Sequence, residues 1–307
     1  MGRYCLKRVL GTIPLMVVIS FIIFMFVHMI PGDPARIMAG KDATLEEINR
    51  TRQMLGLDQP LMNQYFMYLD RMFHGDLGTS TTTGQTVAEM IGPRIQPTFT
   101  LAGGALVWSM IIGVLLGVFS AVKRGKWGDY IGMLVAISGI SIPVFWLGLV
   151  LIQIFSVQLG WLPAGGLDSF ESYILPSFSL GISVMAIMAR FSRSSMLENL
   201  KEDYVRTARA KGQTESMVVL KHAFRNSLIE VVTVAGLQIG GLLAGSILVE
   251  TVFTIPGMGR LLVDSIKFRD YPVIQAELLL FSLQFVVINL IVDLLYGVIN
   301  PKIRYDS

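Results

Sequence analysis

The chain has 307 residues, of which 53% are hydrophobic and only 15% are charged. A soluble globular domain carries about 25% charged residues, so this composition excludes an ordinary water-soluble protein. The formal net charge of +3 is too small to indicate a nucleic-acid partner, and a single cysteine, Cys5, excludes an internal disulfide. Because only three histidines accompany it, we expect no metal site; they are His28, His74 and His222.

Six apolar segments are long enough to cross a membrane, since a helical span needs about 20 residues. The first follows the basic sequence MGRYCLKR and has 22 residues, which is longer than the apolar region of a cleavable signal. No small-x-small cleavage site follows it, so we predict an uncleaved first span. The predicted spans are 9–30, 98–122, 130–158, 174–189, 228–252 and 278–299.

The basic residues of the connecting segments predict the orientation of the chain. Sixteen Lys and Arg residues lie on one side of the membrane and three on the other, with the long loop 31–97 left aside. Because short loops rich in Lys and Arg stay in the cytoplasm, we expect both termini inside and the long loop outside. The predicted regions are the first segment 1–30, the outer loop 31–97, the transmembrane core 98–299 with its cytoplasmic loop 190–227, and the cytoplasmic tail 300–307.

The outer loop carries signals for two short helices. Thr44 and Glu47 have the spacing of a capping box, and Gly56 marks the end of the helix that they begin. Pro60 suits the first turn of a second helix, over 60–73. The sequence leaves two roles open for this pair of helices: a lid packed on the spans, or a surface on which a partner docks.

The cytoplasmic loop contains the basic stretch DYVRTARAKG, residues 203–212. Gly212 ends a predicted helix and a second helix follows it, so we expect a helical hairpin. Periodicity alone leaves two interpretations open, a passive connector between spans or a docking element. The apolar stripes at helical spacing are Leu197, Leu200, Tyr204 and Ala208 in the first helix, and Met217, Leu220, Phe224 and Leu228 in the second.

The stretches DYVRTARAKG and LKHAFRN resemble the cytoplasmic loop of ATP-binding-cassette (ABC) importer permeases of the dipeptide, oligopeptide, nickel and glutathione group. IPGDPAR, LGLDQPLMNQY and GDLGTS resemble the outer region of these permeases, and GISIPVFWLG resembles their third span. ETVFTIPGMGRLLVDSI and RDYPVIQAE resemble their last outer loop. Within the group, FSVQLGWLP, MARFSRSS and RDYPVIQAELLLFSL are most similar to glutathione importers. The resemblance covers nearly the whole chain.

The wider superfamily has the pattern Glu-Ala-Ala-x-x-x-Gly in this cytoplasmic loop. With its glycine set on Gly212, the first three positions fall on Arg206, Thr207 and Ala208. The glutamate is absent, so a salt bridge assigned to it elsewhere does not carry over. The resemblance implies that the loop receives the ATPase subunits. The expected coupling residues are Tyr204, Arg206, Thr207, Ala208, Arg209, Lys211, Gly212, His222, Arg225 and Asn226.

Two further groups of residues are candidates for function. Polar residues inside the last two spans are candidates for the translocation path, although they also suit hydrogen bonds between helices, and Asp293 also suits the membrane interface. They are Gln238, Gln284, Asn289 and Asp293. The resemblance places an outer gate in the last outer loop, at Glu250, Pro256, Gly257 and Gly259.

The resemblance implies an all-α polytopic membrane protein with six transmembrane helices and the type I ABC importer permease fold. It also implies a bacterial inner membrane and four partners: a homologous second permease subunit, two cytoplasmic ATP-binding subunits and an extracytoplasmic solute-binding protein. Lipid surrounds the spans, and no nucleic acid binds. Neither Gly40-Lys41 nor Gly125-Lys126 is followed by Ser or Thr, so the chain lacks a phosphate-binding loop. We therefore expect a transport subunit without a cofactor and without enzymatic activity.

Other functions make different predictions. A nickel-chelate importer permease of the same family would share these motifs, and the substrate stays open among glutathione, dipeptides, oligopeptides and nickel chelates. An ion-coupled secondary transporter predicts internal repeats and ionisable residues at the membrane midplane, and neither is recognisable in the sequence. An intramembrane enzyme needs paired catalytic groups, and no Ser/His/Asp constellation or metal-ligand spacing is recognisable either.

Overall fold

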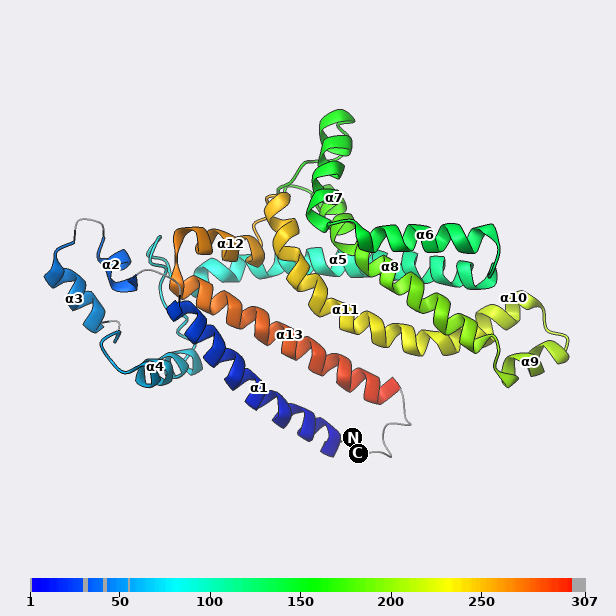
Figure 1. The fold of residues 1–307 in the computed structure, drawn as a ribbon, viewed down its shortest axis with the longest axis horizontal. Helices are drawn as coiled ribbons and strands as arrows, with labels where there is room; N and C mark the ends of the chain where they lie inside the picture. The colour runs from blue at the N-terminus through cyan, green and yellow to red at the C-terminus, as the bar shows by residue number, and fades with distance from the viewer. Residues whose placement is uncertain (1, 30–32, 41–42, 55, 300–307) are drawn as a thin grey trace.

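The computed structural model describes residues 2–29, 33–40, 43–54 and 56–299. The regular elements of this part of the chain are all helical, and its single β-type contact is an isolated bridge between Thr79 and Thr86. The predicted cytoplasmic tail 300–307 lies outside the described residues. Figure 1 shows an elongated bundle with α2, α3, α4 and α12 at one end and α9 and α10 at the other. We call these the outer end, after the predicted orientation, and the hairpin end.

Five helices are long and apolar enough to cross a membrane, and a bent pair of helices gives a sixth when it is counted as one broken span. This confirms the prediction of six spans in an all-α membrane protein. The five helices are α1 (Gly2–Met29), α5 (Val87–Val122), α8 (Ile174–Asn199), α11 (Phe224–Val252) and α13 (Tyr271–Ile299). The bent pair is α6 (Trp127–Ser141) and α7 (Val144–Leu151), which continues as a π-helix over Ile152–Gln158.

Several helices extend beyond the predicted spans: α8 continues to Asn199 instead of ending at 189, and α13 begins at Tyr271 instead of 278. Two further spans differ in ways that have a local cause. Helix α5 begins at Val87 rather than at residue 98, with the Thr86 hydroxyl accepting from the Glu89 amide at 3.3 Å. Prolines normally interrupt a helix, and Pro93 and Pro97 inside α5 hide this early start from the sequence. The predicted span 130–158 is not one rod, because α6 and α7 meet at 101° beside a proline, and from α7 onward the chain points away from the long axis of the bundle in Figure 1. Helix α7 still packs on the core, where its Leu151 is buried.

Close helix contacts hold the core together. A Cβ on Gly113 would lie 2.6 Å from the Met185 carbonyl oxygen, and one on Gly117 would lie 2.4 Å from the Ala189 carbonyl oxygen. These glycines form a Gly-x-x-x-Gly frame that lets α5 approach the backbone of α8. In α11 a second Gly-x-x-x-Gly frame begins at Gly236 and allows a close approach to α13. A Cβ on Gly236 would lie 2.7 Å from the Val292 side chain.

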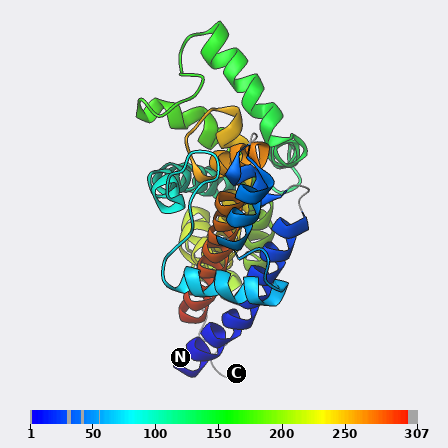
Figure 2. The same ribbon diagram turned by 90° about the vertical axis from the view of Figure 1, so that its left-hand side faces the viewer.

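Three short helices lie at the outer end: α2 (Pro34–Ala39), α3 (Leu45–Met54) and α4 (Leu61–Phe73). The capping box is confirmed: the Thr44 amide donates to Glu47 Oε2 at 2.7 Å, and the Glu47 amide donates to Thr44 Oγ1 at 3.3 Å. The Thr44 amide lowers the pKa of the Glu47 carboxyl, and so does the Thr44 hydroxyl, which donates to the same Oε2 at 2.9 Å. Figure 2 shows α4 running across this end of the molecule. The buried Tyr65 of α4 joins it to α1 through a 2.8 Å hydrogen bond with Ser20 Oγ.

Candidate functional site

The hairpin consists of α9 (Asp203–Ala210), the short helix α10 (Glu215–Met217) and a π-helix over Val218–Ala223. Its seam is apolar: Val205 and Ala208 are buried in one cluster with Val218, Ala223 and Met196. The hairpin therefore has its own small core, which packs on the end of α8. This core holds α9 at a fixed place on the bundle.

The predicted first stripe is wrong in part. It ran from Leu197 through Tyr204 to Ala208, but α8 ends at Asn199 and α9 begins at Asp203. The break between them resets the helical phase, so Val205 takes the buried position next to Ala208. Tyr204 is 37% exposed, and its hydroxyl donates to Asn199 Oδ1 at 2.7 Å.

The predicted second stripe is also wrong in part. The π-helix has more residues per turn than an α-helix, so it shifts the buried face. Val218, Val219 and Ala223 face inward, whereas Met217 is 48% and Leu220 is 61% exposed. The hairpin thus presents two large apolar side chains at its surface.

Polar contacts fix the two arms of the hairpin relative to each other. Arg209 donates twice to the Glu215 carboxylate, at 2.7 and 3.1 Å, and lowers the pKa of that carboxyl. His222 Nε2 lies 2.6 Å from Gln213 Oε1. Within α9, the Thr207 hydroxyl donates to a backbone carbonyl at 2.9 Å, and Arg206 pairs with Asp203 at 3.1 Å. The other predicted coupling residues are exposed on the same hairpin or at the start of α11: Lys211, Arg225 and Asn226.

Gly212 makes the turn between the two arms. Its φ is +75°, in the left-handed region that glycine adopts at little cost. A Cβ at this position would meet no heavy atom within 4 Å. Backbone conformation alone, and not a lack of space, favours glycine here.

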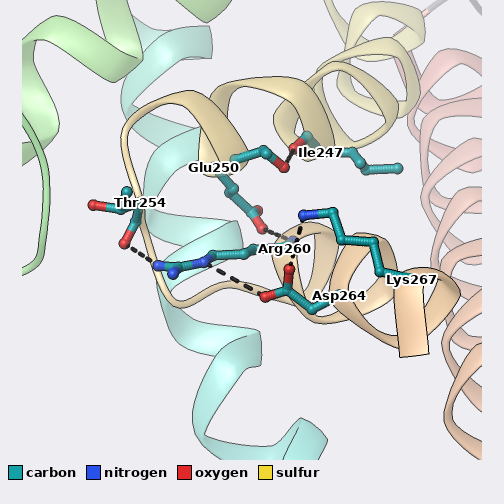
Figure 3. Close-up of polar contacts among 7 residues, drawn as sticks. Ile247, Glu250, Thr254, Arg260, Asp264 and Lys267 are labelled. Carbon is teal, nitrogen blue, oxygen red and sulfur yellow. Dashed lines mark hydrogen bonds and ion pairs between the residues drawn. The ribbon is translucent and has the colours of Figure 1, made fainter. Parts of the chain in front are cut away.

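At the outer end, Glu250 organises the loop that follows α11. Its side chain is fully buried, accepts from Thr98 Oγ1 at 2.8 Å, and accepts from the backbone amide of Arg260 at 3.1 Å. Thr98 in turn accepts from the Met258 amide at 2.9 Å. Figure 3 shows the carboxylate facing the first turn of α12 (Met258–Phe268), where free backbone amides favour an anion. One side chain therefore ties α5, α11 and α12 together.

The loop glycines fit closely against this carboxylate. A Cβ on Gly257 would lie 2.3 Å from Glu250 Oε2, and one on Gly259 would lie 2.5 Å from Ile247 Cα. Pro256 is exposed at the tip of the loop. The structure thus brings the four predicted gate residues together. Close packing explains the residue type at three of these positions, Glu250, Gly257 and Gly259. A gating motion stays a prediction.

Polar side chains on α12 extend this arrangement toward the solvent (Figure 3). Arg260 donates to the Thr254 carbonyl at 2.7 Å and lies 3.7 Å from the Asp264 carboxylate. Lys267 binds the same carboxylate at 3.2 Å. All three charged side chains are exposed, so these pairs add little stability.

A second buried acid was missed in the sequence. Asp270, in the turn before α13, accepts from Ser80 Oγ at 2.5 Å, the Thr81 amide at 3.0 Å and Thr82 Oγ1 at 2.9 Å. The quoted stretches GDLGTS and RDYPVIQAE therefore meet in space. The available signal in the sequence is the run of hydroxyl residues that begins at Ser80. The aspartate that these hydroxyls bind is 188 to 190 residues away, so the sequence does not indicate the pairing.

The predicted path residues have separate surroundings. Asp293 forms an ion pair with Arg8 of α1 at 3.1 Å, which joins the first and last spans. Asn289 Nδ2 donates to the Phe285 carbonyl of its own helix at 2.8 Å. Gln284 Nε2 lies 3.4 Å from the sulfur of Met258, and Gln238 on α11 is half-buried. A role in lining the path stays a prediction for these residues.

Two polar contacts toward the hairpin end were not predicted. Arg193 binds the buried Asp129 through two hydrogen bonds, at 2.6 and 2.8 Å, and so fixes α6 to α8. The Ser195 hydroxyl donates to Glu230 at 2.7 Å and fixes α8 to α11. Arg193 lies in the stretch MARFSRSS. A charged residue this close to an apolar span is the feature of the sequence that could have indicated a buried ion pair.

Comparison with known proteins identifies the family. Residues 113–305 match the family described as "Binding-protein-dependent transport system inner membrane component", and residues 1–102 match the N-terminal region of such membrane components. The chain belongs to this family. It is a multi-pass permease subunit of an ABC importer, a transport component rather than an enzyme. This overturns the alternatives of an ion-coupled transporter and of an intramembrane enzyme.

Curated relatives are similar over their full length. The "Glutathione transport system permease protein GsiC" of Escherichia coli and that of Shigella dysenteriae are each 55% identical over 305 residues, which cover 99% of this chain and 100% of each relative. A chain of the MetNI methionine ABC transporter, in inward-facing conformations, covers 69% of this chain and 96% of its own length, with a TM-score of 0.59 and 18% identity. A chain of an amino acid ABC transporter has a TM-score of 0.54 and 17% identity, and covers 68% of this chain and 94% of its own length. These two share the type I permease fold.

Proposed function

We propose that this chain forms half of the channel of an ATP-driven importer for glutathione or closely related small peptides. The observation that carries the proposal is the 55% identity to glutathione permeases over 99% of the chain. The similarity includes the outer loop and the hairpin as well as the spans, so it covers the regions through which an importer contacts its partners.

In this proposal the complex lies in the bacterial inner membrane. The chain pairs with a homologous permease subunit, two ATP-binding subunits bind on the cytoplasmic side, and a solute-binding protein delivers the peptide from outside. The family description supports this assembly, because it names transport that depends on a binding protein. The absence of a phosphate-binding loop from this sequence supports separate ATP-binding subunits.

The surface of the hairpin supports a contact with an ATP-binding subunit. Met217 and Leu220 are exposed apolar side chains on an otherwise charged element, and Tyr204 is partly exposed on the other arm. Interfaces are commonly centred on a few such anchors. Val205 and Ala208 fill the core of the hairpin, so they position the contact rather than make it.

The test is uptake by the reconstituted complex. Proteoliposomes would contain this chain, its second permease and its ATP-binding subunits, with the solute-binding protein added outside. We expect ATP-dependent accumulation of labelled glutathione, unaffected by an excess of nickel chelate. Uptake of the nickel chelate without uptake of glutathione or of any tripeptide would contradict the proposed substrate class.

A further inference from the structure

The turn between α5 and α6 carries exposed cations at three of four successive positions, Lys123, Arg124 and Lys126. It lies toward the hairpin end of the bundle in Figure 1. The Lys126 amide donates to the Lys123 carbonyl at 2.9 Å and closes the turn, so the three side chains start from one short piece of backbone. None of them belongs to the predicted hairpin, path or gate residues.

Acidic side chains do not balance these charges. None of the three cations forms an ion pair with a residue that the structure describes. Asp129 is the only acidic residue between positions 90 and 167 of the sequence. It is buried, and Arg193 binds both of its carboxylate oxygens, at 2.6 and 2.8 Å. Its charge is therefore already compensated, and the turn keeps three positive charges.

Basic residues elsewhere toward this end show the contrast. Arg8 pairs with Asp293 at 3.1 Å, and Arg209 pairs with Glu215 at 2.7 Å. In the α5–α6 turn the cations have one another as neighbours instead, and like charges repel. A bound anion relieves this repulsion, so the charge of the turn favours an anionic partner.

An exposed stripe of aromatic and apolar side chains begins directly after the cations. Trp127 is 82% exposed and Tyr130 is 65% exposed. Ile131 and Leu134 continue this face of α6 at helical spacing, and both are exposed. Trp and Tyr are enriched where a membrane protein passes from the lipid headgroups to the hydrocarbon. The surface therefore places cations at the level of the headgroups and apolar side chains beside the hydrocarbon.

The end of α5 supplies a second apolar wall. Phe119 and Val122 are each about half exposed there. A Cβ on Gly128 would lie 3.1 Å from the Phe119 ring and 3.6 Å from Lys123 Cβ, so the first turn of α6 packs directly on the end of α5. A partner with a charged head and apolar chains can therefore contact the cations and both helices at once.

We infer that the α5–α6 turn is a binding site for the headgroup of an anionic phospholipid. The phosphate lies against Lys123, Arg124 and Lys126, and the acyl chains pack along the exposed faces of α5 and α6. An acidic protein surface also supplies negative charge, but it lacks the chains that the apolar stripe suits. The predicted orientation places the turn at the cytoplasmic leaflet, where anionic lipids attract basic residues beside a span. The inference does not depend on which solute is imported.

Quenching of Trp127 fluorescence by brominated lipids tests the inference on the full chain. Brominated phosphatidylglycerol and brominated phosphatidylcholine are titrated separately into nanodiscs of unlabelled phosphatidylcholine, and W127F gives the background of the other tryptophans. We expect the anionic lipid to half-quench Trp127 at a mole fraction at least about fivefold lower than the neutral lipid, since one basic residue near an anionic surface contributes about this factor. Both leaflets have the same composition, so the orientation of the chain does not affect the result.

Removal of the three charges should abolish the preference. In K123Q/R124Q/K126Q we expect the two lipids to quench Trp127 equally, and high salt should reduce the preference of the wild type because it screens exposed charges. The control variant R36Q/R50Q/R71Q removes three exposed charges at the outer end and should keep the wild-type preference. If the triple variant does not fold, K123Q/K126Q carries the test with a reduced preference. Equal quenching by the two lipids in the wild type, or an unchanged preference in the folded charge variants, would overturn the inference.

Two further measurements separate a lipid from other anions. Inorganic phosphate should lower the preference no more than sodium chloride of the same ionic strength does. A specific loss in phosphate would assign the turn to a free anion and overturn the lipid site. Binding of the ATP-binding subunits to the same nanodiscs should leave the preference unchanged, whereas its loss would assign the turn to a protein interface and also overturn the inference.

Discussion

Two glycines of this permease are required for different physical reasons. Gly212 in the hairpin has a φ of +75° and open space around it, so a side chain there strains the backbone. Gly257 in the outer loop has a φ of −99°, which any residue adopts, but a Cβ there would lie 2.3 Å from Glu250 Oε2. Substitutions at the two sites should therefore follow different rules.

At Gly212 the identity of the new residue should matter more than its size. Asparagine tolerates the left-handed conformation, whereas a β-branched residue does not. We expect Gly212→Asn to transport at close to the wild-type rate, and Gly212→Val to destabilise the turn by about 1–2 kcal/mol and to reduce transport. Uptake in proteoliposomes measures both. Equal loss in the two variants would show that free space at the turn, and not φ, is what function needs.

At Gly257 even the smallest side chain should be harmful. We expect Gly257→Ala to lower the unfolding free energy by about 1–3 kcal/mol, as overpacking of a tight contact does. Gly241→Ala is the matched control, because its Cβ would meet nothing within 4 Å and alanine favours the helix. Thermal unfolding of the two variants in one detergent compares them. A midpoint for Gly257→Ala as high as that of Gly241→Ala contradicts the close packing described for this loop.

At the scale of elements, the sequence predicted that a hairpin exists but placed its surfaces incorrectly. Apolar periodicity identified two arms, and Gly212 located the turn between them. The faces depend on helical phase, and two events change that phase: the break between Asn199 and Asp203, and the π-helix over Val218–Ala223. Neither event has a Pro or Gly to mark it. Leu220 was therefore predicted inside and is 61% exposed.

The corrected faces separate contact residues from core residues. We expect Leu220→Ser to leave the chain folded and inserted but to weaken its binding to the ATP-binding subunits, because it removes an exposed anchor. Ala208→Glu should unfold the hairpin itself, because it places a carboxylate in an apolar cluster. Pull-down of the ATP-binding subunits, together with protease sensitivity of residues 203–223, distinguishes the two. Protease sensitivity in Leu220→Ser would place Leu220 in the core after all.

The ion pair between the arms should make the hairpin sensitive to acid. Arg209 lowers the pKa of the Glu215 carboxyl in the folded state, so the pair stabilises the hairpin above the ordinary carboxyl pKa of about 4.3. That contribution is lost as the pH falls through the lowered pKa. Because both side chains are exposed, we expect no more than about 0.5 kcal/mol. Glu215→Gln should increase amide hydrogen exchange in α9 at neutral pH and make no difference in acid strong enough to protonate Glu215 in the folded chain. A difference that persists in acid would contradict this origin.

At the scale of the whole molecule, the spans were predictable and the contacts between them were not. Hydropathy is a local property, so the apolar segments predicted the number of membrane spans and their order along the chain. Asp270 and Ser80 are 190 residues apart, and Glu250 and Thr98 are 152 apart, so local sequence does not indicate that they meet. Helix packing brings these residues together, and packing is encoded by small residues such as Gly113 and Gly117 whose partners lie on other helices.

The two ends of the molecule should be independent in stability. The hairpin core around Val205 and the outer contact between Gly257 and Glu250 share no residue, and the hairpin and α12 lie at opposite ends in Figure 1. Distant substitutions without shared partners add within about 0.5 kcal/mol. We expect Val205→Ala, which removes buried methyl groups at a cost of about 2 kcal/mol, and Gly257→Ala to add in the double variant.

Unfolding free energies of the wild type, both single variants and the double variant, measured in one lipid environment, form the complete cycle. A coupling energy near zero means that the chain supplies two separately folded ends and that communication between them needs the ATP-binding subunits and the delivered peptide. A coupling clearly above about 0.5 kcal/mol would mean that the isolated permease already links its hairpin to its outer loop. In that case the stiff spans α5 and α11, which run between the two ends, would transmit a change at one end to the other without any partner bound.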